Sequence, residues 1–315
     1  MPTESEPTQS VSAPAASVGS PQPGILAFGT THHAYLEFDL TVEASEQVLT
    51  GFVGALDQSL VTGAGSMAVL GFRPELWAKL VPEHVHPGLA GFNRPLRGLD
   101  DFVMPATQHD VAVWVQGGAE DAVFDLSRAL INAVAAWATL AEDTEGWVYH
   151  HHRDLTGFVD GTENPHLSQL PGIVQIPEGP AAGGSVLLLQ RWPHDVEAWE
   201  ALPVPDQEKV IGRTKESDVE LAPKPPSSHI ARTDQDDLGD ILRRNTAFGT
   251  AGAHGTMFVG IASGSEVMQK MLDQMAGVDG MRDALTFYSH PETGGYYYLP
   301  SVQQLDPYRP DLSGE

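Results

Sequence analysis

Cysteine is absent from the 315-residue chain, and basic residues are scarce. The absence of cysteine excludes disulfide bonds, thiolate catalysis, cysteine-bound zinc, iron–sulfur clusters and haem attached through a CxxCH motif. Lys and Arg number 17 against 42 Asp and Glu, so the formal net charge is −25. Because the basic residues are scattered rather than clustered, we expect neither nucleic acid nor an anionic membrane surface as a partner.

The sequence also lacks long hydrophobic runs. None approaches the roughly 18 apolar residues of a membrane span. Residues 1–23 are rich in Ser, Pro and Ala, and they lack the basic start, the twin arginine and the apolar core of an export signal. We therefore expect a disordered tail over residues 1–23 and a cytoplasmic location.

Hydrophobic periodicity predicts an α+β fold built from two similar halves. In residues 24–156 the order is β-α-β-β-α-β, with strands expected at 33–40, 66–72, 109–116 and 146–152 and helices at 46–60 and 121–141. Residues 184–301 repeat it, with strands expected at 184–192, 228–232, 255–263 and 294–300 and helices at 195–202, 205–213 and 265–276. This order is typical of tandem ferredoxin-like halves, each an antiparallel sheet with helices on one face. Residues 157–183 connect the halves, and residues 302–315 form a C-terminal tail.

The connection begins with GFVDGTENP, in which one carboxylate, Asp160, stands among glycines. A D-G pair by itself is typical of a plain turn. A long ordered connection between two halves is also a common place for functional residues. The loop alone does not decide between a turn and a site.

Histidines occur in two suggestive places. His150 to His152 are adjacent, but on a strand their side chains would alternate between faces, so we expect a surface or structural role rather than a metal site. His229 begins the apolar segment SHIAR after a Pro-rich loop. By itself this segment favours a histidine at a strand edge, but it also fits the neutral iron ligand that a non-covalent haem protein needs, backed by a carboxylate.

A third group lies in ILRRNTAFGT, where two arginines precede Asn245 in an apolar segment. On a strand Arg243 and Asn245 face one way and Arg244 the other. A buried Arg–Asn pair is costly without a polar or anionic partner, and the cleavage of peroxide would supply developing negative charge. An ordinary solvated edge strand explains the same residues.

Taken together, these segments resemble the dye-decolourising peroxidases, a family of haem enzymes. RDLTGFVDGTENP carries the GxxDG motif of the family, and DQEKVIGRTK, SHIAR, LRRNTAFGT and TGGYYYLPS follow in the family's order. The resemblance covers residues 24–301 and is strongest to the short bacterial branch that has no export signal. It implies one non-covalent haem b per chain, held mainly by the C-terminal half.

The resemblance also implies roles for individual residues. His229 is expected to be the proximal iron ligand, and Asp283 of MRDALTF the carboxylate that hydrogen-bonds its imidazole. Asp160 and Arg243, with Asn245 beside them, are the expected distal catalytic residues. Gly161 would let the loop approach the porphyrin, where a Cβ would clash. Arg213 of IGRTK is expected to bind a haem propionate by bidentate pairing.

The implied activity is a peroxidase that reduces hydrogen peroxide through an oxoferryl intermediate and oxidises organic electron donors such as dyes and phenols. Two alternatives stay open: a haem- or porphyrin-handling protein that removes iron or oxidises porphyrinogens, and a non-catalytic haem carrier. The family implies a homo-oligomer, a dimer or hexamer. The short segment after Ser301 lacks a Leu-, Ile- and Gly-rich targeting tail, so we do not expect packaging in a protein nanocompartment. Surface aromatics could pass electrons from bulky donors; the candidates are Trp147, Tyr149, Trp192, Trp199 and Tyr296 to Tyr298.

Overall fold

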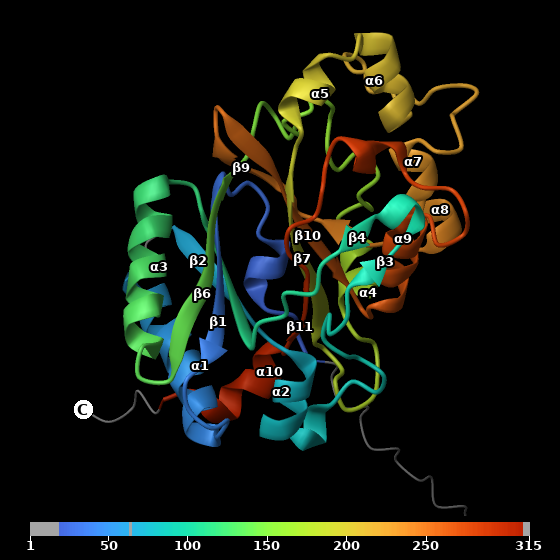
Figure 1. Cartoon of the computed structure of the whole chain (residues 1–315). Coiled ribbons are helices and arrows are strands. Elements are labelled where there is room, and N and C mark those ends of the chain that lie inside the picture. The colour runs from blue at the N-terminus through green and yellow to red at the C-terminus, as the bar shows by residue number, and fades with distance from the viewer. Residues whose placement is uncertain (1–18, 63–64, 311–315) are drawn as a thin grey trace, which may run out of the picture.

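A computed structural model describes residues 19–62 and 65–310 of the chain, without the side chains of residues 58–62 (Figure 1). The N-terminal half contains β1 (His32–Leu40), α1 (Glu46–Thr62), β2 (Ser66–Phe72), β5 (Val111–Gly117), α3 (Glu120–Val134) and β6 (Ala138–Trp147). Its strands are antiparallel in the order β6-β1-β5-β2. This is the ferredoxin-like order, so the predicted fold class is confirmed for this half.

The second half repeats the same strand order. Its strands are β7 (Ser185–Pro193), β9 (Thr246–Thr250), β10 (Ala253–Ala262) and β11 (Gly295–Leu299), arranged antiparallel as β11-β7-β10-β9. Helix α9 (Glu266–Ala276) follows β10. The connection from β7 to β9 carries α5 (Val196–Glu200), α6 (Val204–Ile211), α7 (His229–Arg232), α8 (Gln235–Leu238) and the short strand β8 (Leu242–Arg243).

Smaller elements complete the described chain. Those of the N-terminal half are η1 (Pro23–Leu26), α2 (Pro74–Leu80), η2 (Pro82–His84), β3 (Leu96–Arg97), η3 (Leu99–Asp101) and β4 (Val103–Met104). Those of the rest are α4 (Leu170–Val174), η4 (Ala284–Phe287), α10 (Val302–Leu305) and η5 (Asp306–Tyr308). None of the helices within the described ranges is long and apolar enough to cross a membrane.

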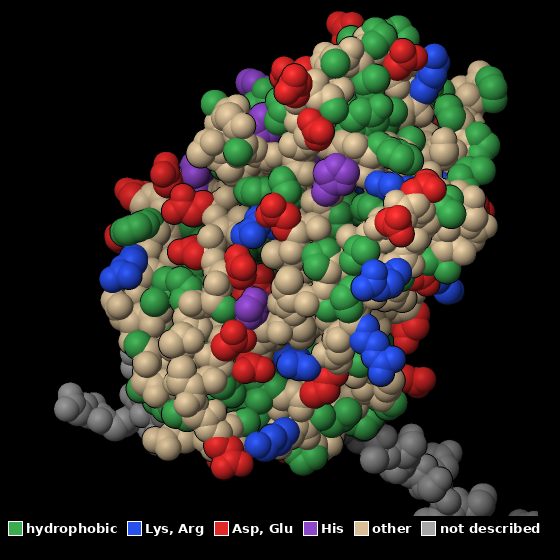
Figure 2. Space-filling model, viewed as in Figure 1, with side chains coloured by type: hydrophobic (Ala, Val, Ile, Leu, Met, Phe, Trp, Pro, Cys, Tyr) green, Lys and Arg blue, Asp and Glu red, His purple; other side chains and the backbone are tan. Residues whose placement is uncertain are grey.

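The two sheets join edge to edge and close into a ring. Strand β6 pairs with β9, with Gly146 opposite Phe248, and β11 meets β2 where Tyr298 lies opposite Phe72. Because β10 also pairs with β7, eight strands follow one another around a barrel. Helices α1 and α3 cover one outer flank, and α7, α8 and α9 lie on the opposite flank (Figure 1). Acidic and basic side chains are interspersed over the face in view in Figure 2.

Closure of the barrel buries both faces of β1. Leu36 and Phe38 pack in the core under α1 and α3, as the alternating pattern predicts. Tyr35, on the other face, joins Trp114 and Tyr297 in the apolar core inside the barrel. A strand expected to be half-buried is therefore buried on both sides, because the second half covers the face that an isolated sheet would expose to water.

Three sequence-based assignments of secondary structure were wrong. The helix expected over 121–141 ends at Val134, and residues 138–141 belong to β6, because pairing with β1 overrides the helix propensity of an Ala-rich segment. Of the strand expected at 146–152, only Gly146 and Trp147 are in a strand, as the end of β6, and His150, His151 and His152 all have positive φ values. The segment 228–232 is helix α7, not a strand. A segment of four residues is too short for the periodicity of its apolar residues to distinguish a helix from a strand.

The two tails differ from the expected boundaries where the structure describes them. Gln22 is buried, accepts a hydrogen bond from Leu70 N and donates to Leu70 O and Pro300 O. Its side chain thus bridges the seam between β2 and the end of β11. At the other terminus Leu305 is buried in the core under α1 and α3. Residues 1–18 and 311–315 of the expected tails lie outside the described residues.

Inside the barrel wall a carboxyl group is buried against a phenol. Glu37 is 4% exposed and accepts a hydrogen bond from Tyr297 Oη. Burial raises the pKa of Glu37 to about 7, although the Tyr297 hydrogen bond and the charges of His109 and Arg191 oppose the rise. The folded protein therefore keeps this group protonated at pH values where the unfolded chain has released the proton.

This buried acid predicts a pH-dependent stability. The folded pKa lies above the unfolded one, so the contribution is fully present below about pH 4.5 and is lost as pH rises to about 7. Glu37→Gln keeps an acceptor for Tyr297 but does not titrate. Urea unfolding of both proteins between pH 5 and 8 should show the wild type losing roughly 2–3 kcal/mol relative to the variant. A difference that stays constant across this range would show that Glu37 titrates normally.

Candidate active site

A cavity lies on the outer face of the C-terminal sheet, between β7 and β10 on one side and α7, α9 and η4 on the other. Its volume is about 1160 Å³, a figure that includes solvent at the open mouth. Most of the lining is apolar; the residues include Leu188, Trp192, Ile211, Ile230, Ile241, Phe258, Met268, Met271, Leu272 and Leu285. Polar side chains, among them Asp160, His229 and Arg243, interrupt this apolar surface, and their arrangement defines the chemistry of the site.

His229 stands at the first position of α7 and faces this cavity. Its Nδ1 lies 2.7 Å from Oδ2 of Asp283, a fully buried residue at the N-terminus of η4. The other carboxylate oxygen, Oδ1, accepts the backbone N–H of Leu285 at 2.8 Å. Asp283 therefore holds the proton on Nδ1, and the Nε2 lone pair is left for a ligand in the cavity.

The electrostatics of His229 show which charges lie near it. Burial lowers the pKa of His229, but the charge and hydrogen bond of Asp283 outweigh burial, so the net shift is upward. Arg243 lowers the pKa and Asp160 raises it. Asp160 and Arg243 are therefore close enough to His229 for their charges to affect its pKa. Sequence analysis placed His229 on a strand and did not predict that it would begin a helix.

Asp160 lies in a tightly folded loop that lines the same cavity. Its backbone N–H donates to His152 O at 2.8 Å, and Asn164 N donates to Gly161 O at 2.9 Å. Gly157 and Gly161 have φ values of 92° and 78°, a region that favours glycine. The glycines of the motif are therefore required by the turn that presents Asp160, and Gly161 itself lines the cavity.

Arg243 and Asn245 also line the cavity, as their alternation predicts. The side chain of Asn164 fixes the backbone of Arg243 on both sides, accepting from its N–H at 2.8 Å and donating to its carbonyl at 2.9 Å. Asn245 Oδ1 accepts Val259 N–H at 3.0 Å, which leaves its amide N–H groups for the cavity. Arg243 Nε is buried and has no partner among the described residues, so a donor is held ready for a ligand.

Arg244, in contrast, turns into the barrel. It donates to Ala27 O and to Gln116 Oε1, each at 2.9 Å, and its guanidinium lies 5.1 Å from the ring of Trp114. Its burial lowers its pKa to about 10. Neighbouring arginines thus have different environments: Arg244 anchors the strand, and Arg243 is presented to the cavity.

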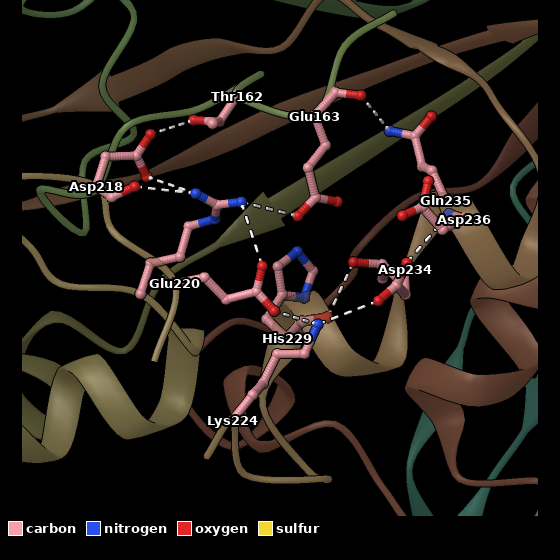
Figure 3. A network of polar contacts seen from close by, with 11 residues as sticks. Thr162, Glu163, Asp218, Glu220, Lys224, His229, Asp234, Gln235 and Asp236 are labelled. Atoms are coloured by element: carbon pink, nitrogen blue, oxygen red, sulfur yellow. Dashed lines mark hydrogen bonds and ion pairs between the residues drawn. The ribbon is translucent and has the colours of Figure 1, made fainter. Parts of the chain in front are cut away.

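Arg213 lines the cavity next to a group of acidic side chains, and Figure 3 shows three of them, Glu163, Asp218 and Glu220. Its guanidinium lies 3.3 Å from Glu163, 3.6 Å from Asp218 and 3.9 Å from Glu220. Glu220 also pairs with Lys224 at 2.7 Å. Sequence analysis did not identify these carboxylate partners of Arg213. Glu163 lies within the quoted GFVDGTENP motif, as does Asn164, whose side chain binds the backbone of Arg243.

The other candidates from the sequence lie outside the polar part of the site. Of the aromatic candidates for electron transfer, Trp192, Trp199 and Tyr296 to Tyr298 are buried and belong to the core, which is what most of these candidates were expected to be. Trp147 and Tyr149 are half-buried, and His150 to His152 are exposed in their turn. No group of three or more His, Asp or Glu side chains in the described part of the chain is arranged to hold a metal ion.

The comparisons with known proteins agree with this geometry. The family model "Dyp-type peroxidase, C-terminal" matches residues 151–304. A dye-decolorizing peroxidase from Brevibacterium linens is 35% identical over 79% of this chain and 68% of its own. The chain belongs to the dye-decolourising peroxidase family. The family predicted from the sequence is therefore confirmed.

Solved structures of dye-decolourising peroxidases share the whole fold. The enzyme from Bacteroides thetaiotaomicron matches with a TM-score of 0.85 and 28% identity, over 92% of this chain and 98% of that chain. A variant of DypB from Rhodococcus jostii RHA1, solved in complex with heme, matches with a TM-score of 0.84 and 29% identity, over 92% and 99% of the two chains. These matches confirm the α+β architecture of paired ferredoxin-like halves.

Proposed function

We propose that this chain is a haem b peroxidase that reduces hydrogen peroxide and oxidises organic one-electron donors, with His229 as the axial ligand of the iron. The observation that carries the proposal is the His229–Asp283 pair, which engages Nδ1 and so directs Nε2 at a large apolar cavity. The same cavity holds Asp160 and Arg243, the groups that peroxide cleavage needs. A haem carrier would require neither of them.

The residues present fit a haem. The apolar walls suit the faces of a porphyrin, and the imidazole with its buried carboxylate partner suits iron. The unpartnered Arg243 Nε and the free amide of Asn245 suit a polar ligand beside the iron. Arg213 would take a propionate at the rim, in competition with the carboxylates that already surround it. When bound, the haem iron would supply the electron exchange that peroxide reduction requires.

The protein side chains would manage protons and charge. Asp160 would take a proton from one peroxide oxygen and return it to the other, first as general base and then as general acid. Arg243 would direct its guanidinium at the negative charge that develops on the departing oxygen. Asn245, fixed by Val259 N–H, would hold a water molecule that shares in this transfer. The two hydrogen bonds between the Asn164 side chain and the Arg243 backbone hold Arg243 in position for this role.

Four further properties are also proposals: an alternative activity, the oligomeric state, the location and the electron donor. Removal of iron from haem would use the same cavity, and the appearance of free protoporphyrin would identify it. A homo-oligomer and a cytoplasmic location remain predictions from the sequence. The physiological donor is expected to be an organic molecule oxidised at or near the surface, because the cavity is lined closely by side chains.

The ligand role of His229 is tested by haem titration. His229→Ala should lose most of its haem on purification or show a changed ligand spectrum, because the other imidazole that lines the cavity, His194, is hydrogen-bonded at both ring nitrogens. His166→Ala, an exposed histidine in the loop after GFVDGTENP, is the matched control and should bind haem like the wild type. Unaltered haem content and an unaltered absorption spectrum in His229→Ala would refute the assignment.

The division of labour between Arg243 and Asp160 gives a second test. Removing one electrostatic donor typically costs about 10²–10³-fold in rate, whereas a lost proton-transfer group costs about 10²–10⁴-fold where nothing replaces it. Water held by Asn245 can replace Asp160 in part. Arg243→Leu should therefore slow the reaction of the haem-loaded protein with peroxide at least as much as Asp160→Asn near neutral pH.

Stopped-flow absorbance of the haem band measures both rates. Arg243→Lys keeps the positive charge but loses the planar guanidinium, so its rate should lie between those of the wild type and Arg243→Leu. A nearly inactive Asp160→Asn beside a fast Arg243→Leu would reverse the order.

A further inference from the structure

A second hollow lies between helix α3 and the outer face of strand β6, which are side by side in Figure 1. It is separate from the cavity that holds His229, because the two share no lining residue. We call it the α3–β6 groove. The side chains that give it its character are Glu120, Phe124 and Ser127 of α3 and Asp143, Glu145 and Trp147 of β6. The mechanism described above uses none of them.

The groove exists because β6 is the strand of the N-terminal sheet that α3 leaves uncovered. In the pairing of β1 with β6, Leu36 lies opposite Asp143 and Ala34 lies opposite Glu145, so all four side chains are on the outer face of the sheet. Leu36 is buried in the core under α1 and α3, whereas Asp143 and Glu145 are exposed. The outer face of β6 is therefore open to a ligand from solvent.

Carboxylates dominate the charge of the groove. Glu120, Asp143 and Glu145 line it, and Asp121 and Asp125 extend the acidic surface along α3. None of these five forms an ion pair with another residue in the described part of the chain. Partial burial raises the pKa of Asp143, and no neighbouring cation opposes the rise. The groove therefore carries negative charge that the protein itself does not neutralise.

The groove also holds apolar surface and a hydroxyl group without a partner. Phe124 is 56% exposed, and Trp147 is half-buried at the other wall. Ser127 is only 7% exposed, and its Oγ is buried without a hydrogen-bond partner among the described residues. A buried hydroxyl group without a partner is costly, so a polar group of a ligand would stabilise this position.

This combination fits an organic cation that contains an aromatic ring. The carboxylates attract the positive charge, and the rings of Phe124 and Trp147 offer faces for stacking and for cation–π contact. A metal ion fits less well, since no three His, Asp or Glu side chains of the described residues are arranged to hold one. Arg128 and His32 also line the groove, but the carboxylates outnumber them. The resulting field favours a cation over an anion.

The groove adjoins the wall of the haem cavity at the seam between the two halves. Trp147 of β6 lies opposite Ala247 of β9, so both side chains are on the outer face of the barrel. Asn245, two residues before Ala247, lines the haem cavity. With about 4.8 Å between strands and about 3.3 Å per residue along a strand, the Cα atoms of Trp147 and Asn245 are about 8 Å apart. A ligand in the groove is thus close to the cavity without entering it.

We propose that the α3–β6 groove is a binding site for aromatic electron donors that carry a positively charged group. The inference rests on the proposed peroxidase function and names a class of donor for it. A phenol bound there loses one electron to the haem that peroxide has oxidised, and it loses one proton. A carboxylate of the groove takes up this proton and releases it to solvent. The phenoxyl radical then leaves, so the groove is ready for the next donor.

The test compares two donors that share a phenol and differ in charge: tyramine, which is a cation, and 3-(4-hydroxyphenyl)propionate, which is an anion. At saturating peroxide the haem-loaded protein should show a lower KM for tyramine. The double variant Asp143→Asn, Glu145→Gln should raise that KM about 10-fold, because two charge contacts are lost. Its kcat for tyramine and its KM for the anionic phenol should stay within about 2-fold of wild type.

A matched control separates the groove from the overall charge of the protein. The double variant Glu83→Gln, Glu178→Gln removes the same number of negative charges at exposed positions outside the groove, and it should leave the KM for tyramine unchanged. Phe124→Ala alters the opposite wall at an exposed position and should raise the KM for tyramine about 3-fold through lost ring contact.

Binding is also measured without turnover. Calorimetry of tyramine with the haem-loaded protein in the absence of peroxide should give a Kd that rises with added salt and rises about 10-fold in the groove double variant. Equal KM values for the two phenols, an unchanged Kd in the groove variant, or equal effects in the control variant would each overturn the proposal. Tyramine that binds as expected to a protein that does not react with peroxide would instead refute the proposed function, and with it the role of the groove as a donor site.

Discussion

The hydrogen bond between His229 and Asp283 is the interaction on which the rest of the site depends. A fully buried carboxylate is costly unless its oxygens are satisfied, and here one accepts from the imidazole and the other from Leu285 N–H. The pair therefore ties the start of α7 to the start of η4, two segments far apart in the chain. It also sets which ring nitrogen faces the cavity, and so it determines what the cavity can bind.

The closed barrel supplies the second constraint. Because β8 and β9 continue the ring of strands, successive residues alternate between the cavity and the barrel interior. Arg244 is fixed inside by Gln116 and by the ring of Trp114, which leaves Arg243 directed at the cavity with an unpartnered Nε. The N-terminal half thus contributes to the site indirectly: it provides the interior against which the strand that carries Arg243 is anchored.

The sequence predicted the fold class, the family and the residues gathered around the cavity. Periodicity was sufficient for strands such as β2 and β10, whose pattern agrees with their pairing. It failed where tertiary contacts override local preference, as in residues 138–141, and where a segment is too short to show a period, as in α7. The pairing of Glu163 with Arg213 and the hydrogen bonds of Asn164 to the Arg243 backbone could not be found from spacing, since they join residues 50 and 79 positions apart. Pairs of this kind are formed by folding and have no local signal.

The reduction potential of the haem tests the central claim most directly. Asp283→Asn keeps an oxygen for Leu285 N–H but removes the negative charge behind the imidazole. If the pair controls the axial ligand, the variant retains haem and its Fe(III)/Fe(II) potential rises, because a less basic imidazole stabilises ferric iron less. Asp234→Asn, which alters a carboxylate that pairs with Lys224 instead, should leave the potential unchanged. A potentiometric titration in which Asp283→Asn retains haem with the wild-type potential would contradict the account.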